Sequence, residues 1–259
     1  MTPNRRLVFA ALAVALLTTT AGCSAVFGGI SDEQLDREED YDDLRERDAD
    51  VAVDVEGASL VGGGEFRAVY HLDGTKELEL YRSSLVREEA LDVHSVRYWY
   101  PNGTELTGSE LEVDQGRSAT TVRVPDENGT LAFSSESGGK SFHLPAFVGG
   151  SYEVTLPDDH RTGNFLFGDV SPDGYDREIV GDTEHLTWDE IDDGASISIR
   201  YYLARDVPLF LGLIGVAVSL GGIGIAYYYR ELKRLKEQRE EFGIDVDAND
   251  DRRKRPPGL

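Results

Sequence analysis

The chain has 259 residues, of which 49 are acidic and 26 basic, so its formal net charge is −23. Such an anion is repelled by a phosphate backbone, which excludes nucleic acid as a main partner. Most of the acidity lies in residues 24–206, which hold 41 acidic and 15 basic side chains, and only two of the 15 are lysine. This balance is typical of proteins that work in molar salt, where the Debye length falls to about 3 Å.

Residues 1–22 have the plan of a secretory signal peptide. Asn-Arg-Arg at 4–6 precedes an apolar run over residues 7–17, and Thr-Ala-Gly at 20–22 supplies small residues before Cys23. The run is too short to cross a bilayer, which takes about 20 apolar residues, so cleavage is favoured over an uncleaved anchor. Thr-Ala-Gly-Cys resembles a lipobox, which predicts that the mature chain begins at Cys23 and carries lipid on its thiol.

Cys23 is the only cysteine of the chain, so no internal disulfide can form. A buried, inert thiol is the alternative, but it would not explain the position of Cys23 at the predicted cleavage point. The paired arginines Arg5 and Arg6 also resemble the core of a twin-arginine signal, and both export routes stay open. Either route places the residues after Cys23 outside the cell.

Residues 207–229 are 23 uncharged residues, which as a helix would span about 35 Å. This exceeds the roughly 30 Å hydrocarbon core of a bilayer and predicts one C-terminal transmembrane helix. Basic side chains crowd its carboxyl side, whereas Arg205 alone lies close on the other side, so residues 230–259 are predicted to be a cytoplasmic tail. The tail begins with a charged helical continuation up to residue 241. The signal peptide predicts the same orientation independently.

Small residues recur along one face of this helix at steps of three and four: Gly212, Gly215, Ser219, Gly222 and Ala226. Such a face lets two helices approach closely, so it is a candidate surface for a homodimer or for a partner membrane protein. Gly221 and Gly224 lie elsewhere on the same helix, so a chance arrangement is the alternative explanation.

Composition divides the exported part of the chain at residue 50. Residues 23–50 are crowded with acidic and arginine side chains and are predicted to form a solvated, lipid-attached stalk, in which Ser31 and Gln34 indicate a capping box. In residues 51–206 the apolar period changes to two, which predicts a β-rich extracellular domain. The alternation is clearest in five segments: residues 51–55, 66–72, 96–100, 152–156 and 197–203.

Turn signals separate these segments. Asp-Gly at 73–74 and Asn-Gly at 102–103 and 128–129 favour hairpins. Pro-Asp-Gly at 172–174 marks a further turn. The sequence therefore predicts a mainly β fold, an immunoglobulin-like or related β-sandwich, followed by one transmembrane helix. Two small β-domains that divide at residues 145–150 stay open as the alternative.

Asn102 and Asn128 each open an Asn-Gly-Thr sequon at a predicted turn. Both are candidate glycosylation sites, because an exported domain reaches the compartment where this modification occurs. The favourable turn chemistry of Asn-Gly explains the same residues without modification, so occupancy stays open.

Catalytic chemistry is hard to find in the sequence. Five histidines are scattered with no pair at the spacing of a helical zinc site: His71, His94, His143, His160 and His185. The acidic residues at 189–193 come nearest to a calcium loop, but Ile191 and Arg200 stand where oxygen ligands are required. No phosphate loop, dinucleotide fingerprint or nucleophile elbow occurs. We therefore predict no catalytic residue, no metal and no cofactor.

Three longer motifs are FVGGSYEV at residues 147–154, VSPDGY at 170–175 and IRYYLARD at 199–206. Together with the lipobox and a glycine-rich helix that ends in tyrosines, they resemble an uncharacterised family of haloarchaeal surface proteins over nearly the whole chain. The resemblance implies a location in the archaeal envelope. It supplies no functional residues, because that family has no assigned activity.

Anchors at both ends and the missing catalytic motifs favour a non-enzymatic cell-surface module that binds or organises another envelope component. A surface hydrolase or metal-dependent enzyme with a site assembled from dispersed residues is the alternative, which His143 and His160 close to Asp158 would support. An accessory subunit that senses an outside signal is a third alternative, although about 30 tail residues are too few for an output domain.

The acidity generates a first prediction. The isolated domain of residues 51–205 is expected to fold in molar salt and to loosen in dilute buffer, where its like charges are poorly screened. Circular dichroism across a potassium chloride series measures the β-signal and the melting temperature. If neither changes down to about 0.05 M salt, the expectation is wrong.

Overall fold

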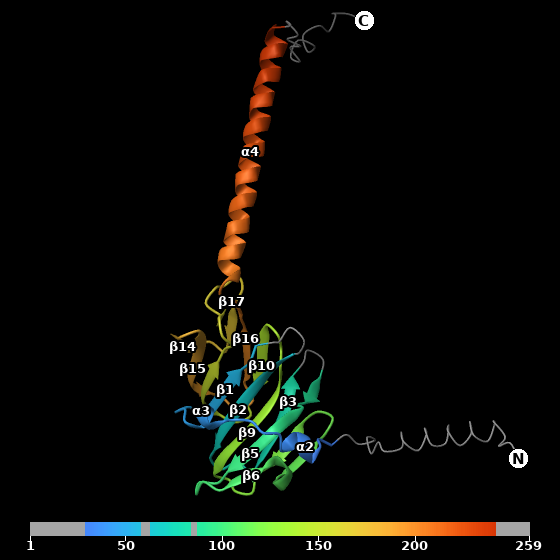
Figure 1. Ribbon diagram of the computed structural model, residues 1–259, viewed down its shortest axis with the longest axis vertical. Helices are drawn as coiled ribbons and strands as arrows, with labels where there is room; N and C mark the ends of the chain where they lie inside the picture. The colour runs from blue at the N-terminus through green and yellow to red at the C-terminus, as the bar shows by residue number, and fades with distance from the viewer. Residues whose placement is uncertain (1–28, 58–62, 84–86, 242–259) are drawn as a thin grey trace, which may run out of the picture. The chain divides into compact units, whose positions relative to one another are not determined.

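The computed structural model describes residues 29–57, 63–83 and 87–241 (Figure 1). The predicted signal peptide, Cys23 and the end of the tail lie outside the described residues. The chain divides into two compact units, Met1–Ala204 and Arg205–Leu259. The described part of the first unit is the β-domain. The second unit contains α4 (Asp206–Glu241).

The largest sheet of the β-domain has eight strands in the order β14-β15-β11-β1-β2-β9-β5-β6. Neighbouring strands are antiparallel, except that β1 and β11 run parallel. The bounds of its strands are β1 (Val51–Val55), β2 (Gly64–Leu72), β5 (Val93–Trp99), β6 (Glu105–Thr107), β9 (Gly129–Ser137), β11 (Gly150–Thr155), β14 (Asp176–Val180) and β15 (Thr183–Ile191).

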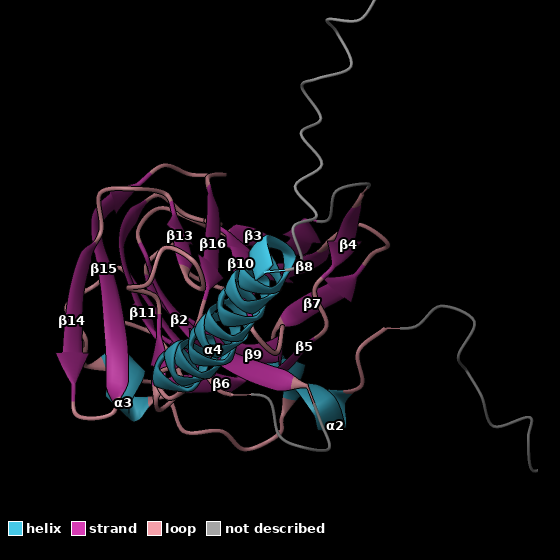
Figure 2. Cartoon of the chain, turned by 90° about the horizontal axis from the view of Figure 1, so that it is seen from above, coloured by secondary structure: helices cyan, strands magenta, loops and turns pink. Residues whose placement is uncertain are grey.

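Smaller sheets lie along one face of the large sheet (Figure 2). One has the order β4-β3-β8-β7, a second β10-β16-β13, and β12 pairs with β17. Their bounds are β3 (Glu77–Ser83), β4 (Glu88–Ala90), β7 (Glu112–Gln115), β8 (Thr120–Arg123), β10 (Ser141–Pro145), β12 (His160–Arg161), β13 (Asp169–Ser171), β16 (Ser196–Arg200) and β17 (Tyr202–Leu203). The short helices of the domain are α2 (Asp32–Leu35), α3 (Asp42–Arg45) and the 3-10 turn η1 (Gly108–Glu110).

The main core lies between these layers. Phe66 of β2 meets Phe142 of β10 edge to face, with ring centroids 5.3 Å apart. Tyr70 of β2 stacks on Phe133 of β9 at 5.6 Å. The core draws side chains from both sides of residues 145–150, and β10 pairs with β16 across that point. The strands therefore form one compact domain and not two small ones.

The prediction of a mainly β fold is confirmed, because all five alternating segments contain strands: β1, β2, β5, β11, and β16 with β17. The immunoglobulin type is not identified. Its sheets have roughly three to five strands each, whereas one sheet here has eight. An immunoglobulin-like pattern of short alternating strands is common to many sandwiches, so periodicity alone does not separate them.

The hairpin predictions have mixed outcomes. Asn-Gly at 102–103 joins β5 to its neighbour β6, as predicted, and Gly103 has a φ of +84°. The predictions for 73–74 and 128–129 are wrong. Each turn joins strands of different sheets, β2 to β3 and β8 to β9. A turn dipeptide reverses the chain equally well within a sheet and between layers, so the local sequence does not decide which.

The prediction of a solvated stalk is wrong for the described residues 29–50. Leu35, Tyr41 and Leu44 are 4%, 2% and 1% exposed. Leu35 enters the main core. Tyr41 and Leu44 cover the opposite face of the large sheet, on a patch of four residues from four strands: Ala52, Val69, Trp99 and Ala132. The solvent side of this segment is acidic, and the few apolar residues among the acidic ones face the sheet. Residues 29–50 therefore belong to the β-domain, and the salt series is to be measured on residues 29–204.

Arg97 of β5 holds the end of α2. Its buried guanidinium donates hydrogen bonds to the main-chain oxygens of three successive residues, Leu35, Asp36 and Arg37. A helix end leaves such carbonyl groups without partners. Next to Arg97, β5 has a bulge in which Ser95 takes a positive φ of 55°. The Ser95 carbonyl accepts a hydrogen bond from the Tyr41 hydroxyl at 2.9 Å, so β5 binds the segment at two points.

The predicted capping box is half present. Ser31 Oγ accepts a hydrogen bond from the Gln34 main-chain nitrogen at 3.3 Å. The Gln34 side chain does not return to Ser31 but donates to Asp92 Oδ1 at 2.8 Å. The side chain therefore adds another contact between the N-terminal segment and the sheet.

Packing of residues 29–50 onto the sheet gives a second prediction. Leu44→Ala removes a fully buried side chain and is expected to lower the free energy of unfolding by about 2–5 kcal/mol. The control Asp43→Ala changes an exposed neighbour and is expected to cost less than about 1 kcal/mol. Urea denaturation of residues 29–204 in molar salt measures both. Equal, small effects would mean that the segment does not pack as described.

Candidate functional site

A polar pocket of about 500 Å³ opens beside β11 and β15. Arg47 follows α3, Thr155 lies on β11, His160 on β12, and Thr183 and His185 lie on β15. Because β11 and β15 are neighbours and residues 29–50 cross this face of the sheet, side chains far apart in the sequence meet here.

Hydrogen bonds connect most of these side chains. Glu153 Oε1 accepts from Arg47 Nη1 at 2.8 Å and contacts His185 Nδ1 at 3.0 Å. His185 Nε2 lies 3.2 Å from Thr183 Oγ1. Arg47 Nη1 also donates to Thr155 Oγ1 at 2.5 Å. The carboxylate, imidazole and hydroxyl follow one another in the order of an acid–histidine–hydroxyl triad.

Two contacts argue against nucleophilic catalysis by this cluster. Thr183 Oγ1 donates its single proton to the Val180 carbonyl at 2.9 Å, so that proton is not directed at His185. Arg47 pairs with Glu153, the carboxylate that would stabilise an imidazolium. In this arrangement the side chains act as a clamp that ties residues 29–50 to β11 and β15. We call Arg47, Glu153, Thr155 and His185 the Arg47 clamp.

The histidines singled out in the sequence do not assemble one site. His160 Nδ1 lies 2.8 Å from the main-chain oxygen of Asp158, not from its carboxylate. His143 lines a different pocket, beside β10. Burial lowers the pKa of His94 and of His71, which stand on β5 and β2. The condition for a hydrolase, His143 and His160 beside Asp158, is therefore not met.

In residues 29–57, 63–83 and 87–241, no group of three or more His, Cys, Asp or Glu side chains is placed to hold a metal ion. Arg47, Glu153 and Thr183 were not singled out by the sequence analysis. A usable signal was present, since Glu153 with Thr155 and Thr183 with His185 are polar at spacing two, on the sheet face opposite the core.

Both sequon asparagines are exposed. Asn102 Oδ1 accepts a hydrogen bond from the Thr104 main-chain nitrogen at 2.9 Å, which closes the turn between β5 and β6. Asn128 lies directly before β9, and its main-chain nitrogen donates to Asp126 Oδ1 at 3.1 Å. Glycosylation at Asn102 and Asn128 stays a prediction.

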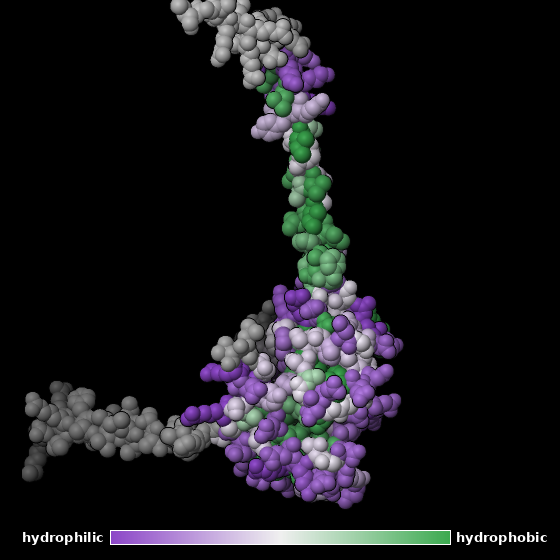
Figure 3. Space-filling model, turned by 180° about the vertical axis from the view of Figure 1, so that it is seen from behind, coloured by the Kyte–Doolittle hydropathy of each residue, from purple (hydrophilic) through white to green (hydrophobic). Residues whose placement is uncertain are grey.

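Within the described chain, one helix is long and apolar enough to cross a membrane: Asp206–Arg239. None of its most apolar window is buried inside the structure. Figure 3 shows an apolar band along α4 that ends in a hydrophilic segment. The helix continues to Glu241, so the predicted charged extension is confirmed.

The face of small residues on α4 is open. A Cβ atom added at Gly212, Gly215 or Gly222 would meet nothing within 4 Å. Ser219 Oγ donates to the Gly215 carbonyl at 2.8 Å, so its hydroxyl is satisfied inside the helix. A shallow groove lies on another side of α4, lined by Gly221, Gly224, Ile225, Tyr228, Tyr229 and Leu232. Association through either face stays a prediction.

A β-rich domain together with a helix able to cross a membrane defines the class of this protein. Residues 47–247 match the family of unknown function DUF5803, and the chain belongs to that family. The match covers every described strand and the whole of α4. No curated protein shows significant similarity to the chain.

The Arg47 clamp gives a third prediction. Arg47 and Glu153 are 19% and 21% exposed, so their ion pair is partly protected from screening by salt. Arg47→Met and Glu153→Gln, made singly and together, are expected to show a coupling free energy of about 1 kcal/mol in urea denaturation at molar salt. The pair of Arg45 and Asp42, 31% and 80% exposed, is the control and should show near zero. Equal coupling in both pairs would contradict the clamp.

Proposed function

We propose that the protein is a membrane-anchored surface protein of a halophilic archaeon, whose acidic β-domain lies outside and binds or organises another envelope component without catalysis. The observation that carries the proposal is the exposure of α4. Its apolar side chains include Leu209, Ile223 and Ile225, which are 67%, 67% and 74% exposed. Exposed apolar area costs about 25 cal/mol per Å² in water, and a bilayer removes this cost along the whole helix.

Charge supports a cytoplasmic tail. Basic residues begin directly after the apolar stretch, at Arg230, Lys233 and Arg234, whereas Arg205 is matched by Asp206 on the other side. Excess Lys and Arg within about 15–20 residues of a span favours the cytoplasmic side. The predicted signal peptide supports the same orientation. Lipid at Cys23 would add a second anchor to the outer surface.

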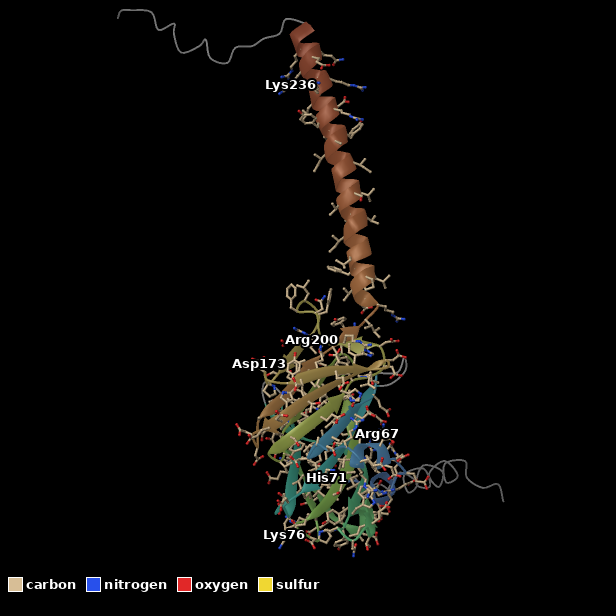
Figure 4. All side chains as sticks on the ribbon, turned by 90° about the vertical axis from the view of Figure 1, so that its left-hand side faces the viewer. Arg67, His71, Lys76, Asp173, Arg200 and Lys236 are labelled. Carbon is tan, nitrogen blue, oxygen red and sulfur yellow. The ribbon has the colours of Figure 1, made fainter. Side chains whose placement is uncertain are left out.

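Arginine-centred clusters of carboxylates support work in high salt. Arg67 of β2 lies among three of them: Asp54 at 2.6 Å, and Glu39 and Glu56 each at 3.7 Å (Figure 4). The single positive charge of Arg67 thus faces three carboxylates, and the cluster keeps a net negative charge that solvent ions must screen. Dissolved cations at molar concentration screen such an excess over about 3 Å.

The non-enzymatic part of the proposal is supported by the Arg47 clamp. The Glu153 carboxylate accepts a hydrogen bond from Arg47 of the N-terminal segment and contacts His185. The His185 imidazole also contacts Thr183 of the same strand, β15. Because the hydroxyl, imidazole and carboxylate of this cluster are engaged in this way, the cluster fits a structural role in a binding or organising domain. On α4, the two open faces would suit a second copy of the helix or a partner membrane protein.

The proposal predicts that the two anchors are unequal. One lipid chain gives only marginal, reversible membrane binding, whereas a spanning helix is effectively irreversible. Truncation before Val207 should therefore release protein, partly or wholly, from membranes washed at alkaline pH. Cys23→Ser should stay in the washed membranes but lose the lipid mass measured by mass spectrometry. Release of Cys23→Ser together with retention of the truncated chain would show that α4 is not the main anchor.

A further inference from the structure

We propose that residues 162–168, which join β12 to β13, form a second membrane contact that places Phe165 and Leu166 in the interfacial region of the bilayer. We call this segment the 162–168 loop. The inference rests on the proposed membrane anchorage by α4. It assigns to the β-domain a surface whose partner is the lipid interface itself.

Exposure of the loop tip is the first observation. Phe165 is 88% exposed and its neighbour Leu166 is 61% exposed. A single exposed apolar residue needs no explanation. Two adjacent large ones at the tip of a loop, on a strongly acidic domain, form an apolar projection that is unfavourable in water. Aromatic and aliphatic side chains of this kind bury favourably at the boundary between headgroups and acyl chains.

Hydrogen bonds hold the tip in a defined turn. The Asn164 main-chain oxygen accepts from the main-chain nitrogens of Phe167 at 3.0 Å and Gly168 at 2.7 Å. Asn164 Oδ1 accepts from the main-chain nitrogen of Leu166 at 3.0 Å. Phe165 and Leu166 are therefore presented by an ordered turn, and little conformational entropy is left to lose on membrane contact.

The base of the loop is fixed to β15. Glu184 is fully buried, and its carboxylate accepts hydrogen bonds from the main-chain nitrogen and the hydroxyl of Thr162. A Cβ atom at Gly168 would overlap the main chain of Thr162. The two ends of the loop thus close on each other more tightly than another residue at position 168 would allow.

Chain connectivity keeps the loop near the membrane. β12 pairs with β17, so that Arg161 lies opposite Tyr202. The Phe167 ring packs on Tyr202 with centroids 5.7 Å apart. Val207, the first residue of the uncharged stretch, follows Tyr202 with only four residues between them, and these five chain steps span at most about 17 Å. Within the β-domain, β17 lies at the end opposite β6 (Figure 1). With α4 inserted, this end of the domain must stay close to the bilayer surface.

The test uses the full chain with Cys23→Ser, which removes the only cysteine. Phe165→Cys and, separately, Leu166→Cys are labelled with an environment-sensitive nitrobenzoxadiazole dye. The chain is reconstituted in molar potassium chloride into vesicles of phosphatidylglycerol and phosphatidylcholine, with or without bromine on the acyl chains. Lys76→Cys is the control, because Lys76 is exposed and lies at the end of the β-domain away from Arg200 (Figure 4).

We expect a blue shift and a loss of emission in brominated vesicles for the labels at positions 165 and 166, and neither change at position 76. Labels at 165 and 166 that bromine does not quench, in a chain that resists alkaline washing, would overturn the loop contact and leave the anchor intact. Labels that are shielded from aqueous iodide but not quenched by bromine would show that the loop contacts protein, and this result would also overturn the proposed membrane contact. Release of the whole chain by alkaline washing would overturn the proposed membrane anchorage by α4 as well as the loop contact.

Discussion

Burial of both faces of the large sheet is the constraint on which the rest of the structure depends. One face packs on the smaller sheets through residues such as Phe66 and Phe142. The other face carries small apolar residues such as Ala52 and Val69, which must also be covered. Residues 29–50 supply that cover, although their composition is that of a solvated segment. Polar contacts then join residues 29–50 to the large sheet. Arg97 makes these contacts at the end of α2, and the Arg47 clamp makes them after α3.

The same constraint explains how acidity and folding are compatible. Most carboxylates occupy the solvent side of their elements, with the buried Glu184 as an exception, while the apolar residues between them fill two clusters. Some arginines lie at points where several acceptors meet, as at Arg67 and Arg97. A long, flexible lysine side chain could not present the planar fork of donors that these points require. The remaining negative charge depends on dissolved cations for screening.

The proposed attachment to a membrane would give a functional role to one end of the β-domain. Pairing of β12 with β17 brings the 162–168 loop against Tyr202, just before the start of α4. The buried Glu184 holds the loop base from β15. A helix alone would leave the domain free to tilt, whereas a second contact through Phe165 and Leu166 would restrict its orientation. An organising role in the envelope requires such a restriction, since a partner must meet a defined face.

Local pattern in the sequence determined the five alternating segments that contain strands, the apolar helix at 207–229, and the charge bias, because period, length and composition are properties of neighbouring residues. It did not determine which strands pair. Asn-Gly at 128–129 leads from one sheet to another, and residues 29–50 pack through a few apolar residues hidden among acidic ones. The Arg47 clamp and the contact of Phe167 with Tyr202 join positions far apart in the chain. Only the tertiary structure decides such contacts, because they follow from the order of strands in space and not from sequence spacing.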